Sequence, residues 1–199
     1  MTFLMHNNLS KHLSNDVGLK SGDIIFISIP NFLYQQIEKG TGCRASHVGM
    51  LFYDDEQGWL VAESKVPLST YTTLEKYLLR TKGGWCCVRR LNRALSESEV
   101  IRLREECDEQ MGKLYHFGFK YFSPRLFCSK FVYDAYKRAL NIEVGELNTF
   151  KELFEKQPGM SIRFWRFWFF GFIPWKRITV TPASQLDADN LESVYLSEK

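Results

Sequence analysis

The sequence predicts an α+β fold, and two segments carry that prediction. Residues 47–64, "HVGMLFYDDEQGWLVAES", place strand-forming residues on both sides of a polar turn, which is the pattern of a β-hairpin. Residues 96–112, "SESEVIRLREECDEQMG", begin with a capping box at Ser96 and Glu99 and continue with apolar residues at helical spacing. We therefore expect one domain in which helices pack against an antiparallel sheet.

The other elements are predicted from apolar runs, helix caps and glycine stops. Residues 1–20 are polar, and we expect a loosely attached arm there, ahead of a single domain over residues 21–199. Four elements are predicted in addition to the hairpin and the capped helix: a strand at 21–29, a short helix from Asn31, a helix from near Thr73 that ends at Gly83-Gly84, and a strand at 85–91.

Size and composition restrict the class of protein. The chain of 199 residues is long enough for a substantial core, and 45% hydrophobic with 25% charged residues is ordinary for a globular domain. A net charge of +3 is too small to indicate nucleic acid as a partner. No segment reaches the roughly 18 uninterrupted apolar residues of a membrane span, so we expect none.

The cysteines do not have the pattern of a disulfide framework. Their number is odd, two are adjacent, and no CxxC metal spacing occurs among Cys43, Cys86, Cys87, Cys107 and Cys128. The N-terminal residues also lack a basic stretch followed by a long apolar one. Both observations predict a reducing, cytoplasmic location.

The hairpin places polar residues at its open end. A turn centred near Asp55 would pair Tyr53 with Gln57 and, further along, His47 with Glu63. Opposed residues of an antiparallel pair point to the same face and lie about 4.5–5.5 Å apart at Cβ. Glu63 could then hold one ring nitrogen of His47, fix its tautomer and raise its basicity. A surface histidine beside a strand-end glutamate would give the same pattern.

Cys128 stands at the predicted start of a helix. In "FCSKFVYDAYKRAL" the helix begins near Phe127 or Cys128, and its apolar face includes Cys128. Free backbone N–H groups and the helix dipole stabilise a thiolate there and can receive an oxyanion. The alternative is that Cys128 is buried filler, as we expect for Cys107. Together with His47 and Glu63 it would supply a nucleophile, a base and an orienter of that base, as in thiol hydrolases.

Several short motifs occur in a fairly specific order between residues 21 and 186. They are "SGDIIFI", "SHVGM", "VAES", "LYHFGFKY", "FCSKFV" and "ITVTPASQL". In these motifs the chain resembles the circularly permuted papain-like amidases of the YebB/YiiX-like group, with the YebB-like branch nearest. That group is related to the NlpC-type cysteine peptidases and to lecithin retinol acyltransferase. The resemblance implies a permuted papain-like (NlpC-type) fold in which the catalytic histidine precedes the cysteine.

The same resemblance implies roles for individual residues. The nucleophile corresponds to Cys128, the catalytic histidine to His47 and the third polar residue to Glu63. A tyrosine about a dozen residues before the cysteine, assigned to the oxyanion site in NlpC-type relatives, corresponds to Tyr115, although Tyr121 is also available. One position departs from the pattern, because Lys130 stands where many relatives carry an acidic residue.

The aromatic-rich segment "IRFWRFWFFGFIPW" at residues 162–175 permits three interpretations. The first is core that covers the sheet. The second is the lining of a site for an apolar acyl chain, with Trp165 and Trp168 at the substrate. The third is peripheral contact with a membrane surface, with arginines at lipid phosphates. Arg163 and Arg166 interrupt the segment, so it cannot span a membrane.

We therefore expect a cysteine hydrolase that cleaves an amide or ester bond in a small-molecule, peptide or acyl substrate. A thiol acyltransferase acting on lipid or acyl substrates is the second hypothesis. A non-catalytic module that binds a peptide or a lipid headgroup is the third. No cofactor or metal is expected, because a zinc site from His47, Glu63 and His116 would lack both an HExxH motif and Cys/His spacing.

Overall fold

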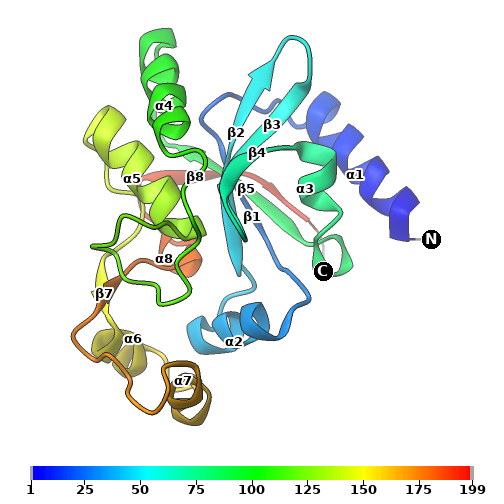
Figure 1. The fold of residues 1–199 in the computed structure, drawn as a ribbon. Helices are drawn as coiled ribbons and strands as arrows, with labels where there is room; N and C mark the ends of the chain where they lie inside the picture. Colours follow the sequence, from blue (N-terminus) through cyan, green and yellow to red (C-terminus); the bar gives the residue numbers. More distant parts are fainter. Residues whose placement is uncertain (1, 198–199) are drawn as a thin grey trace.

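The computed structural model describes residues 2–197 and centres on a six-stranded antiparallel sheet. The order of the strands across the sheet is β4-β3-β2-β1-β5-β8 (Figure 1). Their bounds are Ile24–Ile27 for β1, His47–Asp54 for β2, Gly58–Ser64 for β3, Ser69–Thr73 for β4, Cys86–Leu91 for β5 and Leu191–Leu196 for β8. The predicted α+β class, with helices packed on an antiparallel sheet, is confirmed.

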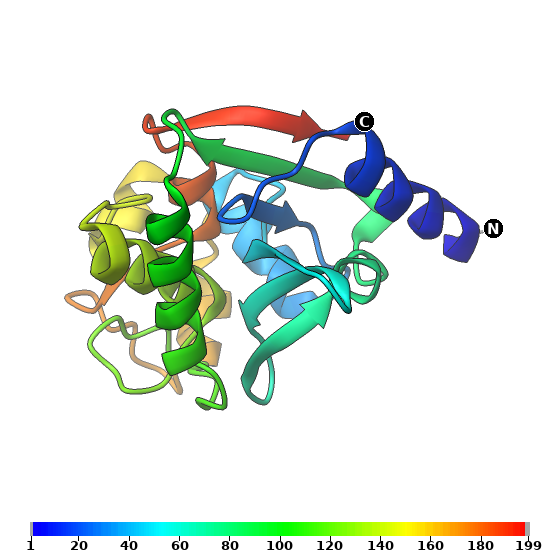
Figure 2. The ribbon, with the colours of Figure 1, turned by 90° about the horizontal axis from the view of Figure 1, so that it is seen from above.

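Helices cover both faces of the sheet (Figures 1 and 2). On one face lie α4 (Glu97–Glu109) and α5 (Cys128–Leu140). On the other lie α1 (Thr2–Asp16) and α3 (Leu74–Leu78), followed by a short 3-10 helix, Lys82–Gly84. The remaining elements lie beyond one end of the sheet or follow α5, and they are α2 (Phe32–Thr41), β6 (Asn148–Thr149), α6 (Phe150–Lys156), α7 (Ile162–Trp168), β7 (Ile178–Thr179) and α8 (Pro182–Leu186).

Strand alternation divides the core between the two faces. Val48 and Met50 of β2 belong to the apolar cluster that includes Phe131 of α5, whereas Leu51 belongs to the cluster that includes Tyr77 of α3. Successive side chains of a strand point to opposite faces, so both clusters require apolar residues from the same strand. His47 has the parity of Leu51 and therefore points towards the face that α3 covers.

The polar N-terminal residues do not form the loose arm that the sequence suggested. They form α1, and Leu13 on this helix is fully buried against the cluster that contains Ile25 and Tyr77. Leu19, just after the helix, is buried in the same cluster. The apolar residues of this stretch are widely spaced, so the sequence did not indicate an amphipathic helix. They nevertheless suffice to hold the helix on the sheet.

The predicted hairpin register is wrong by two residues. Met50 pairs with Ala62 and Tyr53 with Trp59, so the turn is centred on Glu56 rather than on Asp55. The cause is the turn chemistry: the Asp54 carboxylate accepts hydrogen bonds from the backbone N–H groups of Glu56 and Gln57, and Gly58 closes the turn with φ of 70°. A shift of two residues keeps every side chain on its face.

The start signals of the helices were read correctly, but one stop signal was not: α3 ends at Leu78, and Gly83-Gly84 lie in the short 3-10 helix that follows. Asn31 accepts a hydrogen bond from the N–H of Leu33 at the start of α2, and Thr73 caps α3. Ser96 and Glu99 form the predicted reciprocal box at α4. Within residues 2–197, no helix has the length and apolar character needed to cross a bilayer.

Leu13→Ala should lower the free energy of unfolding by about 2–5 kcal/mol, because it leaves a cavity between α1 and the sheet. Lys11→Ala, at an exposed position of the same helix, is the control and should change stability by less than about 0.5 kcal/mol. Urea denaturation of both variants measures the difference. Equal values for the two variants would mean that α1 is attached loosely after all.

Candidate active site

Cys128 is the first residue of α5. The residue before it, Phe127, supplies no side-chain hydrogen bond to the helix, so the amides of the first turn lie beside the sulfur without a side-chain cap. The turn is fixed from behind, because the Ser129 hydroxyl donates to the Val180 carbonyl at 2.8 Å and the Gln185 amide donates to the Ser129 carbonyl at 2.9 Å. These contacts aim a set of N–H groups and the positive end of the helix dipole at Cys128.

His47 and Glu63 form a buried pair at the end of the sheet. The His47 Nε2 and Glu63 Oε2 atoms are 2.6 Å apart, and neither side chain has any exposed surface. The two residues are diagonal rather than directly opposed, which follows from the corrected register. The other ring nitrogen of His47, Nδ1, has no nitrogen or oxygen partner in the described part of the chain. The carboxylate therefore fixes one nitrogen and leaves the second for chemistry.

His47 is not the only side chain that keeps the Glu63 carboxylate ionised. A terminal guanidinium nitrogen of Arg80 lies 2.8 Å from each carboxylate oxygen, and the Thr72 hydroxyl donates to Oε1 at 2.7 Å. Burial alone would raise the pKa of Glu63, but the hydrogen bond and charge of His47 and the cation of Arg80 outweigh it and lower the pKa to about 2. The orienting group is thus a permanent anion.

The charge on His47 responds to both neighbours. Burial alone would lower the pKa of His47, but the charge of Cys128, a side-chain hydrogen bond with Cys128 and the Glu63 carboxylate together raise it above its usual 6.5. Nδ1 is the ring nitrogen that remains for Cys128, since Nε2 is bonded to Glu63. The raised pKa favours the protonated imidazole beside the Glu63 carboxylate.

Three tyrosines surround this set. The ring of Tyr34, on α2, lies edge-on to His47 with centroids 6.0 Å apart, and the ring of Tyr77 lies 5.7 Å from it. Tyr115 is buried and side-chain hydrogen bonding links its hydroxyl with Tyr34 and with Cys128. The other tyrosine that the sequence offered, Tyr121, instead contacts Asp134 and Tyr133. Tyr115 is therefore the tyrosine placed beside the sulfur.

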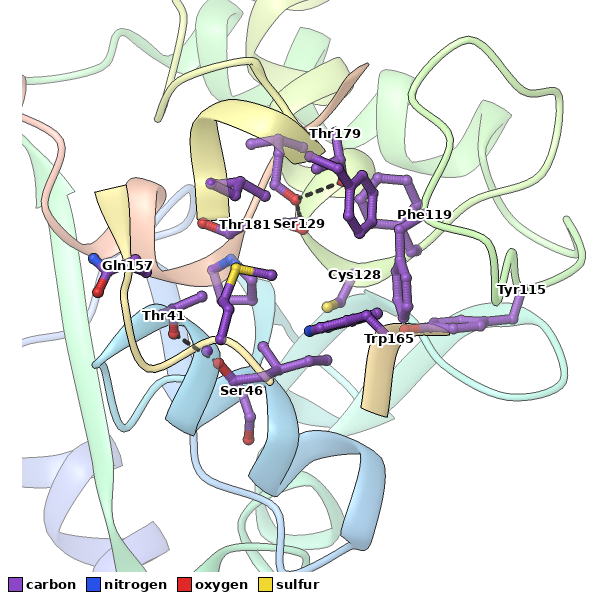
Figure 3. A pocket seen from close by; sticks show the side chains of 18 residues that line it. Thr41, Ser46, Tyr115, Phe119, Cys128, Ser129, Gln157, Trp165, Thr179 and Thr181 are labelled. Atoms are coloured by element: carbon purple, nitrogen blue, oxygen red, sulfur yellow. Dashed lines mark hydrogen bonds between the residues drawn. The ribbon is translucent and has the colours of Figure 1, made fainter. Parts of the chain in front are cut away.

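A narrow apolar pocket opens next to Cys128 (Figure 3). Its volume is about 50 Å³, room for only a few waters at the 10–15 Å³ that each requires. The ring of Trp165 and the hydroxyl end of Tyr115 lie beside Cys128 in this view. The lining is mostly aliphatic and aromatic and includes Phe119, Phe127, Phe150, Leu153, Met160 and Val180.

The wall of the pocket also includes Gly40 and Thr41 at the end of α2, and Ser46 just before β2. Trp165 lines the pocket as predicted, but Trp168 does not. The Trp168 indole N–H donates to the Phe117 carbonyl at 2.9 Å, and its ring lines a separate shallow hollow on the surface. A substrate contact at Cys128 is therefore not supported for Trp168.

Lys130, the position that departs from the resemblance, is neutralised locally. It forms a buried ion pair with Asp134, one turn later on α5, and its ammonium lies 5.2 Å from the centre of the Tyr121 ring. The cation is thus balanced on its own helix and adds no unpaired charge to the pocket.

This arrangement coincides with a known family. A sequence profile of the permuted papain-like amidase enzymes, the YaeF/YiiX or C92 family, matches residues 18–195. The chain belongs to this family. It is 29% identical over 175 residues to the uncharacterised protein YiiX of Escherichia coli K12, covering 88% of this chain and 85% of that protein. A crystal structure described as metalloprotein YiiX from Escherichia coli O157:H7 superimposes with a TM-score of 0.83 at 28% identity, over 90% of this chain and 98% of that one.

Membership confirms the resemblance to the YiiX-like group and the permuted papain-like fold, and in general terms it makes the protein a papain-like cysteine hydrolase. The assignment to a YebB-like branch stays a prediction. His47 precedes Cys128 in the chain, as the permuted order requires. Sequence reasoning missed Arg80 and Tyr34. Neither stands in a motif, and only the fold reveals that the chain after α3 and the helix α2 both return to His47.

Glu63→Gln should flatten the pH dependence of stability between pH 4.5 and 2. The carboxyl has its ordinary pKa of 4.5 in the unfolded chain and about 2 in the folded protein, so the unfolded chain binds more protons in this range and wild-type stability is lost as the pH falls. Urea denaturation at several pH values measures the slope. Glu75→Gln, at an exposed position on α3, is the control; an unchanged slope in Glu63→Gln would show that Glu63 is not held ionised.

Cys128 should be the thiol that iodoacetamide alkylates first at neutral pH. Burial raises the pKa of the other four thiols, to about 12 for Cys86 and about 11 for Cys87, which leaves little thiolate on them. Peptide mass spectrometry over a time course locates the label, with Cys128→Ala as the control. Labelling of the half-buried Cys43 at the same rate as Cys128 would contradict the assignment.

Proposed function

We propose that the protein cleaves an amide or ester bond through an acyl-enzyme on Cys128, with His47 as base and Glu63 as its orienter. The observation that carries the proposal is that the two ring nitrogens of His47 have different neighbours. Nε2 is bound to Glu63, while Nδ1 is free of other partners and beside Cys128. This is the nucleophile, base and orienter arrangement of thiol hydrolases.

The steps follow from the geometry. The Cys128 thiolate attacks the substrate carbonyl carbon, and the carbonyl oxygen takes the negative charge. The first-turn amides of α5 and the Tyr115 hydroxyl are the donors available to that oxyanion. The His47 imidazolium then protonates the leaving amine or alcohol, and the acyl group stays on the sulfur. His47 next takes a proton from water as the water attacks the thioester, which releases the acid and restores the thiolate.

The pocket supports a small apolar group next to the scissile carbonyl. Its polar residues, such as Thr41, Thr179 and Thr181, contribute very little exposed polar surface compared with the apolar lining. Burying a carboxylate or an ammonium there without a partner would cost several kcal/mol. We therefore favour an apolar acyl portion. The same dry lining also favours the second candidate, transfer of the acyl group to an amine or alcohol, because it limits the access of water.

The relative described as a metalloprotein raises the question of a metal at these residues. Within residues 2–197 no group of three or more His, Cys, Asp or Glu side chains is arranged to hold a metal ion. Both oxygens of Glu63 are bound by Arg80, and one is also bound by His47. The donors do not fit a metal, and the proposed mechanism contains no step through one.

A reducing, cytoplasmic location is part of the same proposal. All five cysteines are free thiols, and a nucleophilic thiolate needs surroundings that keep it reduced.

Incubation with p-nitrophenyl butyrate should add a butyryl group to Cys128, visible by intact mass. The adduct should decay in buffer if water is the acceptor, and should persist until an amine or alcohol is added if the enzyme is a transferase.

Glu63→Gln should retain the fold and lower turnover, by up to about 10⁴-fold if the tautomer of His47 is lost.

Two controls sharpen this experiment. A p-nitrophenyl ester of succinate, similar in length but carrying a carboxylate, should acylate more slowly than butyrate if the pocket receives the acyl group. Cys128→Ala should form no adduct while keeping its melting temperature. The proposal would be overturned if neither ester formed an adduct on the wild type while Cys128→Ala still bound the esters. That result would favour the non-catalytic binding module.

A further inference from the structure

Three phenylalanines around the end of α7 stand out into solvent. Phe167 has 81% of its surface exposed, Phe170 95% and Phe172 85%; we call these three residues the aromatic ridge. Single exposed apolar residues are normal, but a contiguous patch of large ones marks an interaction surface. The sequence offered core, acyl pocket or membrane contact for this segment, and the ridge is the part that belongs to neither core nor pocket.

The fold holds the ridge outward by anchoring its neighbours inward. Trp165 is buried and stacks on Phe169 with ring centroids 5.7 Å apart, and Phe150 packs edge-on against both rings. The chain then turns through Phe170, whose φ of 53° lies in the left-handed region that bulky residues avoid. A conformation that is unfavourable for phenylalanine thus displays its ring to solvent.

The two segments that meet beside the ridge are basic and contain no acid, whereas the neighbouring helix α6 carries Glu152 and Glu155. Residues 113–130 and 161–181 include no Asp or Glu and eight basic residues, while the whole chain has a net charge of only +3. The eight are Lys113, Lys120, Arg125, Lys130, Arg163, Arg166, Lys176 and Arg177. Lys130 is the one of them that forms an ion pair within residues 2–197.

The two segments lie together on one face. The Trp168 indole donates to the Phe117 carbonyl, and Arg177 donates to the Gly118 carbonyl at 2.7 Å. A shallow surface hollow brings Arg166 and Arg177 together with the whole ridge. Arg166 and Arg177 therefore flank the exposed rings.

We propose that the aromatic ridge docks the protein peripherally on a lipid bilayer that contains anionic lipids. Exposed phenylalanines insert at the headgroup boundary, and flanking arginines and lysines contact lipid phosphates. A second copy of the chain fits poorly, because the two basic faces would repel each other.

Docking in this way would bring the membrane close to the pocket. Trp165 on the inner side of α7 lines the pocket, and the ring of Tyr115 lies 5.2 Å from that of Phe117, which in turn contacts Trp168. The inference concerns binding and does not require that Cys128 be catalytic.

The test is co-sedimentation of the full chain with vesicles of phosphatidylcholine, alone or with phosphatidylglycerol as one third of the lipid. Wild type and Cys128→Ala should both bind the anionic vesicles, and more salt should weaken binding. The triple variant Phe167→Ser, Phe170→Ser and Phe172→Ser should bind at least about tenfold more weakly. All three positions are exposed, so its circular dichroism, melting temperature and hydrolysis of a soluble ester should match the wild type.

Matched controls separate the ridge from general surface effects. Ile101→Ser removes an apolar residue with 58% exposure from α4 and should not change binding. Arg166→Glu should weaken binding to anionic vesicles, whereas Lys76→Glu on α3 should not. Equal binding by the triple variant and the wild type would overturn the proposal. So would a wild-type dimer in light scattering that the triple variant converts to a monomer, because the ridge would then join two copies.

Discussion

The buried carboxylate of Glu63 is the constraint on which the site depends. A charge removed from water is tolerated only when it is paired and hydrogen-bonded. Here the partners come from three places: His47 on β2, Thr72 on β4 and Arg80 after α3. Any error in the pairing of these strands, or in the seating of α3, would leave the charge without a partner. The same pairing that stabilises the fold therefore also orients the imidazole.

The pairing of His47 with Glu63 was predicted correctly although the predicted register of the hairpin was wrong. His47 and Glu63 share a face for any even shift, so the parity of the hairpin predicts their meeting although the turn was misplaced by two residues. The turn depended on Asp54 as an acceptor for two backbone N–H groups, a local detail that alternation of apolar residues cannot reveal. Likewise, the apolar face of its helix placed Cys128 correctly at the helix start, although Phe127 supplies no side-chain cap.

What the sequence could not supply is contact between distant segments. Tyr34 reaches His47 from α2, and Arg80 reaches Glu63 from the chain after α3, and no periodicity records either approach. Leu13 shows the same limit for the core, because the burial of a leucine in a largely polar segment cannot be predicted until the sheet face that receives it is known. Local patterns thus predicted elements and faces, and tertiary packing selected which polar groups surround the pair.

The aromatic segment shows how one short helix can bury one face and expose the other to water. In α7, Trp165 faces the pocket and the core, while Phe167, two residues further along the helix, faces water. Helical geometry alone makes this division, since residues two apart point in very different directions. Core, acyl pocket and surface contact are therefore compatible interpretations of the same residues. They compete only when the segment is treated as a unit, and they separate as soon as each side chain is assigned to its face.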